Sequence, residues 1–309
     1  MKILVAGGAG FIGFHLCQRL LSEGHEAVCV DNLVTGSQRN VDELSRDAKF
    51  SFVKADITEP NHFGKGFSHV FNLACPASPV DYQRIPIETL RVCSAGTENL
   101  IKLALENRAT FVHASTSEVY GDPLEHPQKE SYWGNVNPQG VRSCYDEGKR
   151  FAEALCMDFH RAKGLDVRIS RIFNTYGPAM RREDGRVISN FITQALAGEP
   201  LAVYGDGSQT RSYCYVSDMV DGLCRLAFTK GIEGKTFNLG NPDEHTVLET
   251  AKIVVEMCAS GSGIVFKPLP KDDPRQRRPD ISKARKSLGF EPKTPFKDGL
   301  AKTIDYFRK

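Results

Sequence analysis

The stretch KILVAGGAGFIG at residues 2–13 decides the fold. Its first five residues are an apolar run typical of a buried strand, and apolar residues recur at helical spacing over residues 11–23. Between them stand Gly7, Gly10 and Gly13. Glycine lets the backbone turn tightly and approach a pyrophosphate, which the N-terminus of the following helix favours. The simpler alternative is a tight strand–helix turn without a ligand.

A second signal follows one strand later. The run EAVCV at 26–30 leads into Asp31, eighteen residues after Gly13, where a carboxylate can accept hydrogen bonds from ribose hydroxyls. The same carboxylate would repel a 2′-phosphate, so the cofactor expected is NAD rather than NADP. ADI at 55–57 and NLA at 72–74 are expected to flank the adenine and the second ribose, although a helix cap explains Asp56 about as well. The expected cofactor residues are Gly7, Gly10, Phe11, Ile12, Gly13, Asp31, Asn32, Asp56, Ile57, Leu73, Ala74, Tyr145 and Lys149.

Strand-like and helix-like segments alternate along the first half of the chain. The apolar runs lie at 2–6, 26–30, 50–54, 69–73, 110–114 and 167–172. This alternation predicts an α/β fold with a doubly wound parallel sheet. After residue 173 the pattern breaks into pieces rich in Gly and Pro, which predicts a smaller α/β lobe. We expect the cofactor domain at 1–173 with 213–240 returning to it, and the smaller, substrate-binding lobe at 174–212 and 241–309.

Composition excludes several classes of protein. The formal charge is +2 over 309 residues, without a long run of like charge, so a nucleic-acid or membrane surface is not expected. Nine scattered cysteines show no metal-ligand spacing and read as reduced packing residues. With no signal-like opening or membrane-length apolar run, the expected location is cytoplasmic.

Tyr145 and Lys149 are four residues apart in YDEGK, so a helix would place them on one face. A tyrosine that acts as a base near neutral pH needs its pKa of about 10 lowered by roughly 3 units. The Lys149 ammonium and the positive charge of an oxidised nicotinamide are the expected sources. Together with the glycine-rich turn and STSEVYG at 115–121, the pair predicts a hydride-transfer enzyme with a tyrosine base.

Along its whole length the chain resembles the extended short-chain dehydrogenase/reductase family, whose cofactor domain is of the Rossmann type. NLACPASPVDYQ (72–83), STSEVYGDP (115–123), RIFNTYGP (171–178) and VYGDGSQTRSYCYVSD (203–218) are similar to the UDP-glucuronate decarboxylases within it. The resemblance implies oxidation at sugar carbon 4, loss of carbon dioxide from the resulting β-keto acid, and re-reduction of the ketone by the same bound cofactor.

The resemblance also implies roles for three residues after the fifth strand. Thr116 would lie near the hydroxyl being oxidised, and Ser117 stands where related 4,6-dehydratases have an Asp that acts as the acid for water loss. Glu118 would orient the sugar or a proton-donating water. The alternative for Ser117 and Glu118 is support of the loop without contact to the substrate.

Further residues are expected to hold the UDP-sugar. Arg211 and Arg277 resemble the family's diphosphate and carboxylate ligands, since a guanidinium offers a fixed fork of donors. The expected substrate residues are Asn174, Arg182, Asn190, Tyr204, Gln209, Arg211 and Arg277. Arg181, Arg275 and Arg278 are interpreted as solvated surface charge, and no metal ligand is expected.

Two other functions stay open at this point. A UDP-glucuronate 4-epimerase or a related NAD-dependent epimerase would share the oxidation step and diverge after it. A catalytically silent NAD-binding sensor would keep the fold, although such proteins often lose the tyrosine or the lysine. The resemblance further implies a homodimer formed by pairing helices, among them the helix that carries Tyr145.

Overall fold

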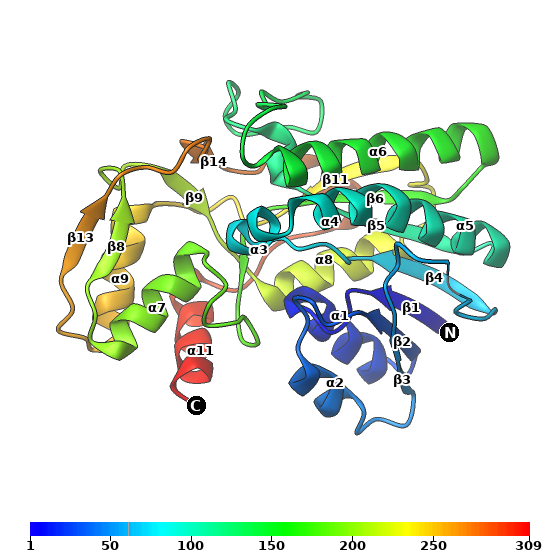
Figure 1. Ribbon diagram of the computed structural model, residues 1–309, viewed down its shortest axis with the longest axis horizontal. Helices are drawn as coiled ribbons and strands as arrows, with labels where there is room; N and C mark the ends of the chain where they lie inside the picture. The colour runs from blue at the N-terminus through cyan, green and yellow to red at the C-terminus, as the bar shows by residue number, and fades with distance from the viewer. Residues whose placement is uncertain (61) are drawn as a thin grey trace.

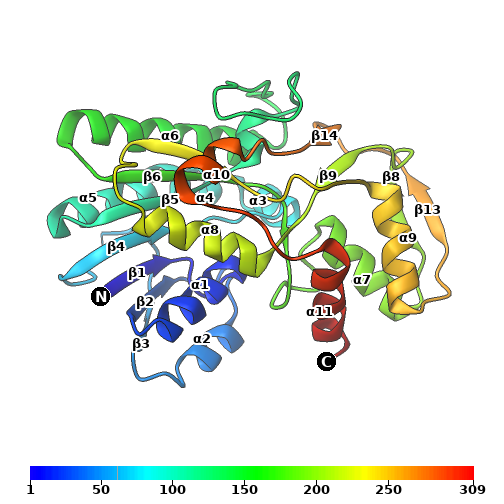
Figure 2. The ribbon, with the colours of Figure 1, turned by 180° about the vertical axis from the view of Figure 1, so that it is seen from behind.

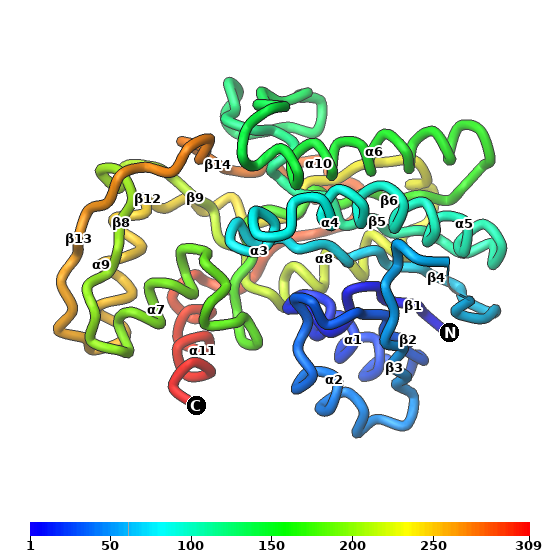
Figure 3. The backbone as a smooth tube through the Cα atoms, in the orientation of Figure 1, coloured from blue at the N-terminus to red at the C-terminus, as the bar shows by residue number. Residues whose placement is uncertain are grey.

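The computed structural model describes residues 1–60 and 62–309. Figure 1 shows two parts: a large parallel sheet flanked by helices, and a smaller part that contains α7, α9 and α11. Figure 3 follows the chain from its N-terminus beside the sheet to its C-terminus at the end of α11, in the smaller part.

The large sheet has seven parallel strands in the order β11-β6-β5-β4-β1-β2-β3. The strands are β1 (Lys2–Ala6), β2 (Glu26–Asp31), β3 (Phe50–Lys54), β4 (Phe67–Asn72), β5 (Thr110–Thr116), β6 (Val167–Ile172) and β11 (Lys235–Leu239). The order reverses direction after β3, from β1 to β4, which is the crossing point where doubly wound sheets bind ligands. The predicted fold class is confirmed, and the six predicted strands lie within two or three residues of the observed ones.

Side chains of each strand point alternately to the two faces of the sheet, and each face has its own core. Ile3 and Val5 pack into the cluster that includes α1 and α8, whereas Leu4 and Ala6 pack into the cluster that includes α5 and α6. Both faces of β1 are therefore buried, which explains its uninterrupted apolar sequence. Figures 1 and 2 show the two helical layers from opposite sides.

The helices that flank the sheet include α1, which matches the helical spacing over residues 11–23, and the chain has one irregularity before α5. They are α1 (Phe11–Ser22), α2 (Gln38–Leu44), α3 (Pro79–Arg84), α4 (Pro86–Arg91), α5 (Thr97–Asn107), α6 (Ser143–Lys163) and α8 (Val216–Phe228). A π-helical turn, Val92–Gly96, joins α4 to α5. The regular α-helix after this turn therefore starts only at Thr97.

The smaller part is built from short strands and four helices. Its strands are β7 (Thr175–Tyr176), β8 (Leu201–Tyr204), β9 (Thr210–Ser212), β10 (Cys214–Tyr215), β12 (Glu244–Thr246), β13 (Ile264–Lys267) and β14 (Gln276–Arg277). Its helices are α7 (Val187–Ala197), α9 (Val247–Cys258), α10 (Ser282–Leu288) and α11 (Phe296–Arg308). β14 pairs with β9 so that Arg277 stands opposite Arg211. This pairing brings two distant arginines to one place.

The chain passes between the two parts more than once. β11 joins the large sheet beside β6, after the strands β8, β9 and β10 of the smaller part. α10 packs against β11, and Lys283 Nζ donates a 2.7 Å hydrogen bond to the carbonyl oxygen of Thr236. The two parts are thus interleaved in sequence. Within the described residues, no helix combines the length and the apolar character needed to cross a membrane.

A substitution at Gly13 tests how tightly the first strand–helix turn is packed. A Cβ atom at this position would lie 2.1 Å from the Gly7 carbonyl oxygen and 2.8 Å from the Gly8 Cα, which are backbone atoms that cannot rotate away. Gly13→Ala should therefore destabilise the cofactor-free protein by about 1–3 kcal/mol, although alanine alone would favour the helix by about 1 kcal/mol. Urea unfolding measures the difference.

The matched control is Gly261→Ala, where nothing lies within 4 Å of the added Cβ. This variant should unfold at the same urea concentration as the native protein. A Gly13→Ala protein as stable as the native one would contradict this prediction, because it would show that the turn can accommodate the added methyl group.

Candidate active site

One cleft runs from the glycine-rich turn, across the carboxyl ends of the central strands, to the smaller part. Its volume is about 910 Å³, and it is lined by residues from both parts, from Gly7 to Arg277. A cleft at this edge of a doubly wound sheet is the expected position for a ligand. The volume is at the upper end of the range for small-molecule sites, so the cleft is large enough for more than a single small ligand.

The glycine-rich turn leaves space for a ligand at the start of α1. Gly7 has a φ of 79°, and a Cβ there would lie 2.7 Å from the Leu73 carbonyl carbon. Gly10 precedes α1, and no side chain caps the first N–H groups of that helix. Uncapped N–H groups at a helix start attract an anion, so the turn fits a dinucleotide's pyrophosphate.

Asp31 ends β2 at the border of the same cleft. Its carboxylate accepts hydrogen bonds from the backbone N–H groups of Ala9, at 3.1 Å, and Leu33, at 2.8 Å. Burial raises the pKa of Asp31, and these two donors oppose that effect by stabilising the ionised form. The side chain thus holds the loop after β2 in place while facing the cofactor part of the cleft.

All the residues expected to bind the cofactor line this cleft. Asp56 does not cap a helix: it accepts hydrogen bonds from the Thr58 N–H and hydroxyl and from the Asn32 side chain. These bonds connect the loops after β2 and β3. Asp56 therefore shapes the wall of the cleft as well as lining it.

Tyr145 and Lys149 lie in α6, as predicted, and both are buried at the cleft. The Tyr145 ring stacks on the Tyr82 ring with centroids 5.0 Å apart. Lys149 Nζ donates a 2.7 Å hydrogen bond to the Ala114 carbonyl oxygen and lies 5.9 Å from the Tyr145 ring centroid. The lysine is thus anchored to the end region of β5 beside the tyrosine.

The protein alone does not lower the pKa of Tyr145. Burial raises the pKa of Tyr145 well above its usual value, and a hydrogen bond with Thr116 opposes this only in part. The main cause is burial of the phenol, and negative charge on Cys75 and Glu118 adds to the effect. The protein alone therefore does not prepare Tyr145 as a base.

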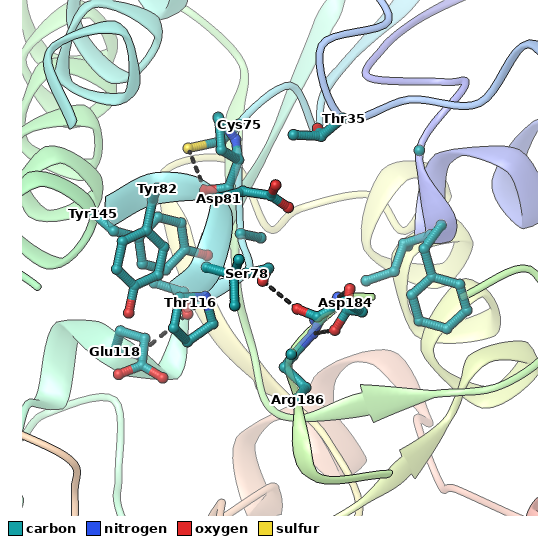
Figure 4. A pocket seen from close by; sticks show the side chains of 18 of the residues that line it. Thr35, Cys75, Ser78, Asp81, Tyr82, Thr116, Glu118, Tyr145, Asp184 and Arg186 are labelled. Carbon is teal, nitrogen blue, oxygen red and sulfur yellow. Dashed lines mark hydrogen bonds and ion pairs between the residues drawn. The ribbon is translucent and has the colours of Figure 1, made fainter. Parts of the chain in front are cut away.

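The segment after β5 brings three expected residues into the cleft. Thr116 ends the strand, and its hydroxyl accepts the N–H of Glu118, which opens a 3₁₀ turn at Ser117–Tyr120. Figure 4 shows Thr116, Glu118 and Tyr145 on the same side of the pocket. Ser117 is buried, and its hydroxyl accepts a 3.2 Å hydrogen bond from Arg277. The sequence order Thr-Ser-Glu thus brings three oxygen-bearing side chains to the wall of the cleft that also holds Tyr145.

Glu118 is held between two arginines. Its Oε2 lies 2.6 Å from Arg142 Nη2, and its Oε1 lies 2.6 Å from Arg277 Nη1. Burial by itself would raise the pKa of Glu118, but the two guanidinium groups outweigh burial and hold this pKa well below its usual range. Glu118 is therefore ionised at neutral pH and has no proton to donate.

The ion pairs extend on both sides of Arg142. Asp273 bridges Arg211, at 2.9 Å, and Arg142, at 3.7 Å, and Asp146 lies 3.9 Å from Arg142. Burial, together with the Glu118 charge, raises the pKa of Asp146 to about 8. Three guanidinium groups, of Arg142, Arg211 and Arg277, thus meet at one place in the cleft, and guanidinium groups are suited to contact an anionic ligand.

The smaller part supplies most of the residues expected to bind substrate. Six of the seven line the cleft: Asn174, Asn190, Tyr204, Gln209, Arg211 and Arg277. Gln209 Oε1 is buried without a hydrogen-bond partner, so it has an acceptor available for a ligand. Arg211 and Arg277, the expected diphosphate and carboxylate ligands, each pair with a carboxylate in the structure, Arg211 with Asp273 and Arg277 with Glu118.

The structure places Arg181 at the cleft and Arg182 outside the residues that line it. Arg182 is not among the residues that line the cleft: it donates to the Phe307 carbonyl oxygen at the end of α11 and covers that ring. Arg181, which was interpreted as surface charge, lines the cleft and pairs with Asp81 of α3. The two are adjacent in sequence, and a loop without strand or helix periodicity gives no indication of which side chain turns inward.

Other residues of the cleft were not expected. Arg186 forms two hydrogen bonds with Asp184, at 2.5 and 2.7 Å, and Ser78 donates to the Asp184 carbonyl oxygen (Figure 4). Arg142 binds Glu118. The sequence DGRVISNFI at 184–192 was the available signal for Asp184 and Arg186. For Arg142 the signal was its place one helical turn before Asp146.

Residues 3–240 match the model of the NAD dependent epimerase/dehydratase family, which is more than half of the chain. The chain therefore belongs to this family. The match covers the large sheet, the tyrosine–lysine pair and the glycine-rich turn.

Particular relatives are similar over the whole chain. UDP-glucuronic acid decarboxylase 3 of Arabidopsis thaliana is 52% identical, with 100% of this chain and 89% of the relative covered. UDP-glucuronic acid decarboxylase 1 of Danio rerio is 50% identical, with 100% and 73% covered. Among solved structures, UDP-glucuronic acid 4-epimerase from Bacillus cereus in complex with UDP-glucuronic acid and NAD superposes with a TM-score of 0.91, at 28% identity over 100% and 99% of the two chains.

The position of Asp31 predicts a preference between two nucleotides. A carboxylate at the ribose site disfavours a 2′-phosphate through charge repulsion, which is worth about 1–4 kcal/mol near a protein surface. Asp31→Asn should therefore lower the ratio of the NADP dissociation constant to the NAD dissociation constant by about tenfold or more. Isothermal titration with each nucleotide measures both constants.

The control is Asp42→Asn, which removes an exposed carboxylate from α2 outside the cleft. It should leave the ratio unchanged. A native protein that binds NAD and NADP equally well would contradict the role given to Asp31.

Proposed function

We propose that this chain is a UDP-glucuronate decarboxylase that forms UDP-xylose and retains NAD through the cycle. The observation that carries the proposal is sequence identity. Over the full length of the chain, about half of all residues are identical to those of curated UDP-glucuronic acid decarboxylases. The family and the cradle at the glycine-rich turn support NAD as the cofactor.

When bound, NAD accepts the hydride of sugar carbon 4 and returns it at the end of the cycle. Tyr145 takes the proton of the carbon-4 hydroxyl, and Thr116 and Ser117 hydrogen-bond the oxygens around it. Since burial raises the Tyr145 pKa in the protein alone, the phenol must first lose its own proton to solvent, and the positive charges of Lys149 and of the oxidised nicotinamide would favour the resulting phenolate.

The resulting 4-ketone is β to the sugar carboxylate, so carbon dioxide leaves readily and the electron pair moves to the ketone oxygen. The Tyr145 hydroxyl is positioned to hydrogen-bond this enolate oxygen, and carbon 5 then takes a proton. The positive charge around Arg142 supports binding of the substrate's carboxylate and diphosphate.

The ion pairs of Glu118 with two arginines argue against a reaction that eliminates water. A 4,6-dehydratase needs an acid to protonate the leaving hydroxyl, and here Ser117 has no acidic proton while Glu118 is kept ionised by two arginines. Decarboxylation of a β-keto acid needs no such acid. The site therefore suits the decarboxylation better than the dehydration.

A 4-epimerase is the second candidate, because a neighbour of nearly the same fold is a UDP-glucuronic acid 4-epimerase. The two reactions share the oxidation and differ in the product: an epimerase keeps the carboxylate. A silent NAD-binding sensor is disfavoured, because Tyr145, Lys149 and Thr116 meet in one cleft.

Product analysis decides between these functions. Purified protein incubated with UDP-glucuronate should release one carbon dioxide for each UDP-pentose formed, and NMR of the product should show the xylose configuration. Formation of UDP-galacturonate without carbon dioxide would replace the proposal with the epimerase, and no reaction in the NAD-loaded protein would favour the sensor.

A second prediction concerns the proton carried by Tyr145. Tyr145→Phe should abolish turnover while UDP-glucuronate still binds, because only the phenolic oxygen is lost. The control is Tyr82→Phe, whose ring stacks on Tyr145 but whose hydroxyl has no partner, and this variant should keep most of the turnover. Steady-state rates and substrate titration measure the two effects. A Tyr145→Phe protein with a tenth of native activity would limit the loss to about 1.4 kcal/mol, too little for the base.

We also propose a homodimer formed by α6 and its neighbour α4. Apolar side chains are exposed on both helices: Ile87 and Leu90 on α4, and Phe151 on α6. Pairing the same face of two copies would bury them. A cytoplasmic location is proposed as well, in keeping with nine cysteines that are free in the described structure.

A further inference from the structure

Cys75 and Cys93 form a pair of thiols at the wall of the cleft. Cys75 follows β4 by three residues and lines the cleft beside Leu73 and Ala74. Cys93 lies in the π-helical turn between α4 and α5. Their Sγ atoms are 3.5 Å apart, in a hydrogen bond between the two side chains. Over residues 1–60 and 62–309, no other two cysteines share such a bond.

The two thiols have different surroundings. The hydrogen bond with Cys93 and the Lys149 ammonium lower the pKa of Cys75 against the effect of burial, whereas the shared hydrogen bond and burial raise the pKa of Cys93. Cys75 is partly exposed, and the other eight cysteines are buried in the described structure. An accessible thiol beside a cation is the more reactive kind, and a buried thiol within reach can complete a disulfide.

From this geometry we propose that Cys75 and Cys93 are a reversible oxidation site, at which a peroxide converts the two thiols to a disulfide. The Cys75 thiolate attacks one oxygen of hydrogen peroxide, the O–O bond breaks, and the departing hydroxide takes a proton to become water. Cys75 is left as a sulfenic acid.

The second step uses the neighbouring thiol. Cys93 loses its proton, and its sulfur attacks the Cys75 sulfur. The S–O bond breaks, and the leaving hydroxide takes that proton to become a second water. Overall, two thiols give up two electrons and two protons, and one peroxide becomes two waters. A disulfide bond is about 2.05 Å long, so the sulfurs must approach by about 1.5 Å.

The position of the pair connects its oxidation to the active site. The Cys93 sulfur packs against Gly148 of α6, where an added Cβ would lie 3.2 Å away, between Tyr145 and Lys149 in the sequence. Cys75 packs against the group formed by Tyr82, Cys144 and Tyr145. Drawing Cys75 toward Cys93 would move the loop after β4, which lines the cofactor side of the cleft. Oxidation is therefore expected to lower turnover, and reduction to restore it.

The test counts and maps thiols, so it does not depend on the substrate assigned above. The folded, NAD-loaded protein is treated with hydrogen peroxide, alkylated, and digested for mass spectrometry. The protein has nine cysteines, so removal of two predicts that seven free thiols remain, with a cross-linked peptide that joins residues 75 and 93. Dithiothreitol should restore all nine thiols.

Two variants separate the pair from the other cysteines. In Cys93→Ser the Cys75 sulfenic acid has lost its hydrogen-bonded thiol partner, so no 75–93 disulfide can form, and under excess peroxide Cys75 should proceed to sulfinic acid, which dithiothreitol does not reverse. Cys258→Ser, on α9 outside the cleft, should form the 75–93 disulfide like the native protein.

The proposal is overturned if the native protein keeps nine thiols under peroxide, or if Cys75 links to Cys144 instead. It is equally overturned if Cys75 of the peroxide-treated Cys93→Ser protein carries neither a sulfenic acid, trapped with dimedone before reduction, nor a sulfinic acid. Since the native protein alone gives the first two outcomes, a variant that fails to fold leaves the proposal testable. Turnover with UDP-glucuronate, measured in parallel, should fall as the two thiols are oxidised and recover when dithiothreitol reduces them.

Discussion

The ionised side chain of Glu118, held between Arg142 and Arg277, is the interaction on which the arrangement of the active site depends. It joins three segments that are far apart in the sequence: the turn after β5, the start of α6, and β14. Removing one member of a buried ion pair leaves an unpaired charge, which costs several kcal/mol, so the three segments hold one another in place. The start of α6 positions Tyr145, and β14 brings the smaller part against the sheet.

This ion-pair arrangement also determines which chemistry the site supports. Because two guanidinium groups keep Glu118 charged, it can orient a ligand or a water but has no proton of its own to give. The Ser117 hydroxyl likewise already accepts a hydrogen bond from Arg277. An oxidised sugar acid in this place can lose carbon dioxide without help from an acid, which agrees with the relatives that share about half of their residues with this chain.

The sequence was sufficient for the sheet and for the cofactor side of the cleft, because these depend on local patterns. Apolar runs predict buried strands, and glycines at 7, 10 and 13 predict the turn that a Cβ would block. The substrate side depends on contacts between distant segments, which no local pattern reports. Arg182 therefore turned out to bind the end of α11, and Arg277 to bind Glu118. Likewise, the spacing of Tyr145 and Lys149 was visible, but the bond from Lys149 to the Ala114 carbonyl oxygen was not.

Hydrogen–deuterium exchange of Glu118→Gln tests most directly whether this residue joins the three segments. The account predicts faster amide exchange than in the native protein at two places 135 residues apart in the sequence, the first turn of α6 beside Arg142 and the β9–β14 pair beside Arg277. Glu147→Gln, which removes a more exposed carboxylate of α6, should change neither. If the Glu118→Gln protein exchanged faster only within the turn at Ser117–Tyr120, Glu118 would not be the residue that holds the site together.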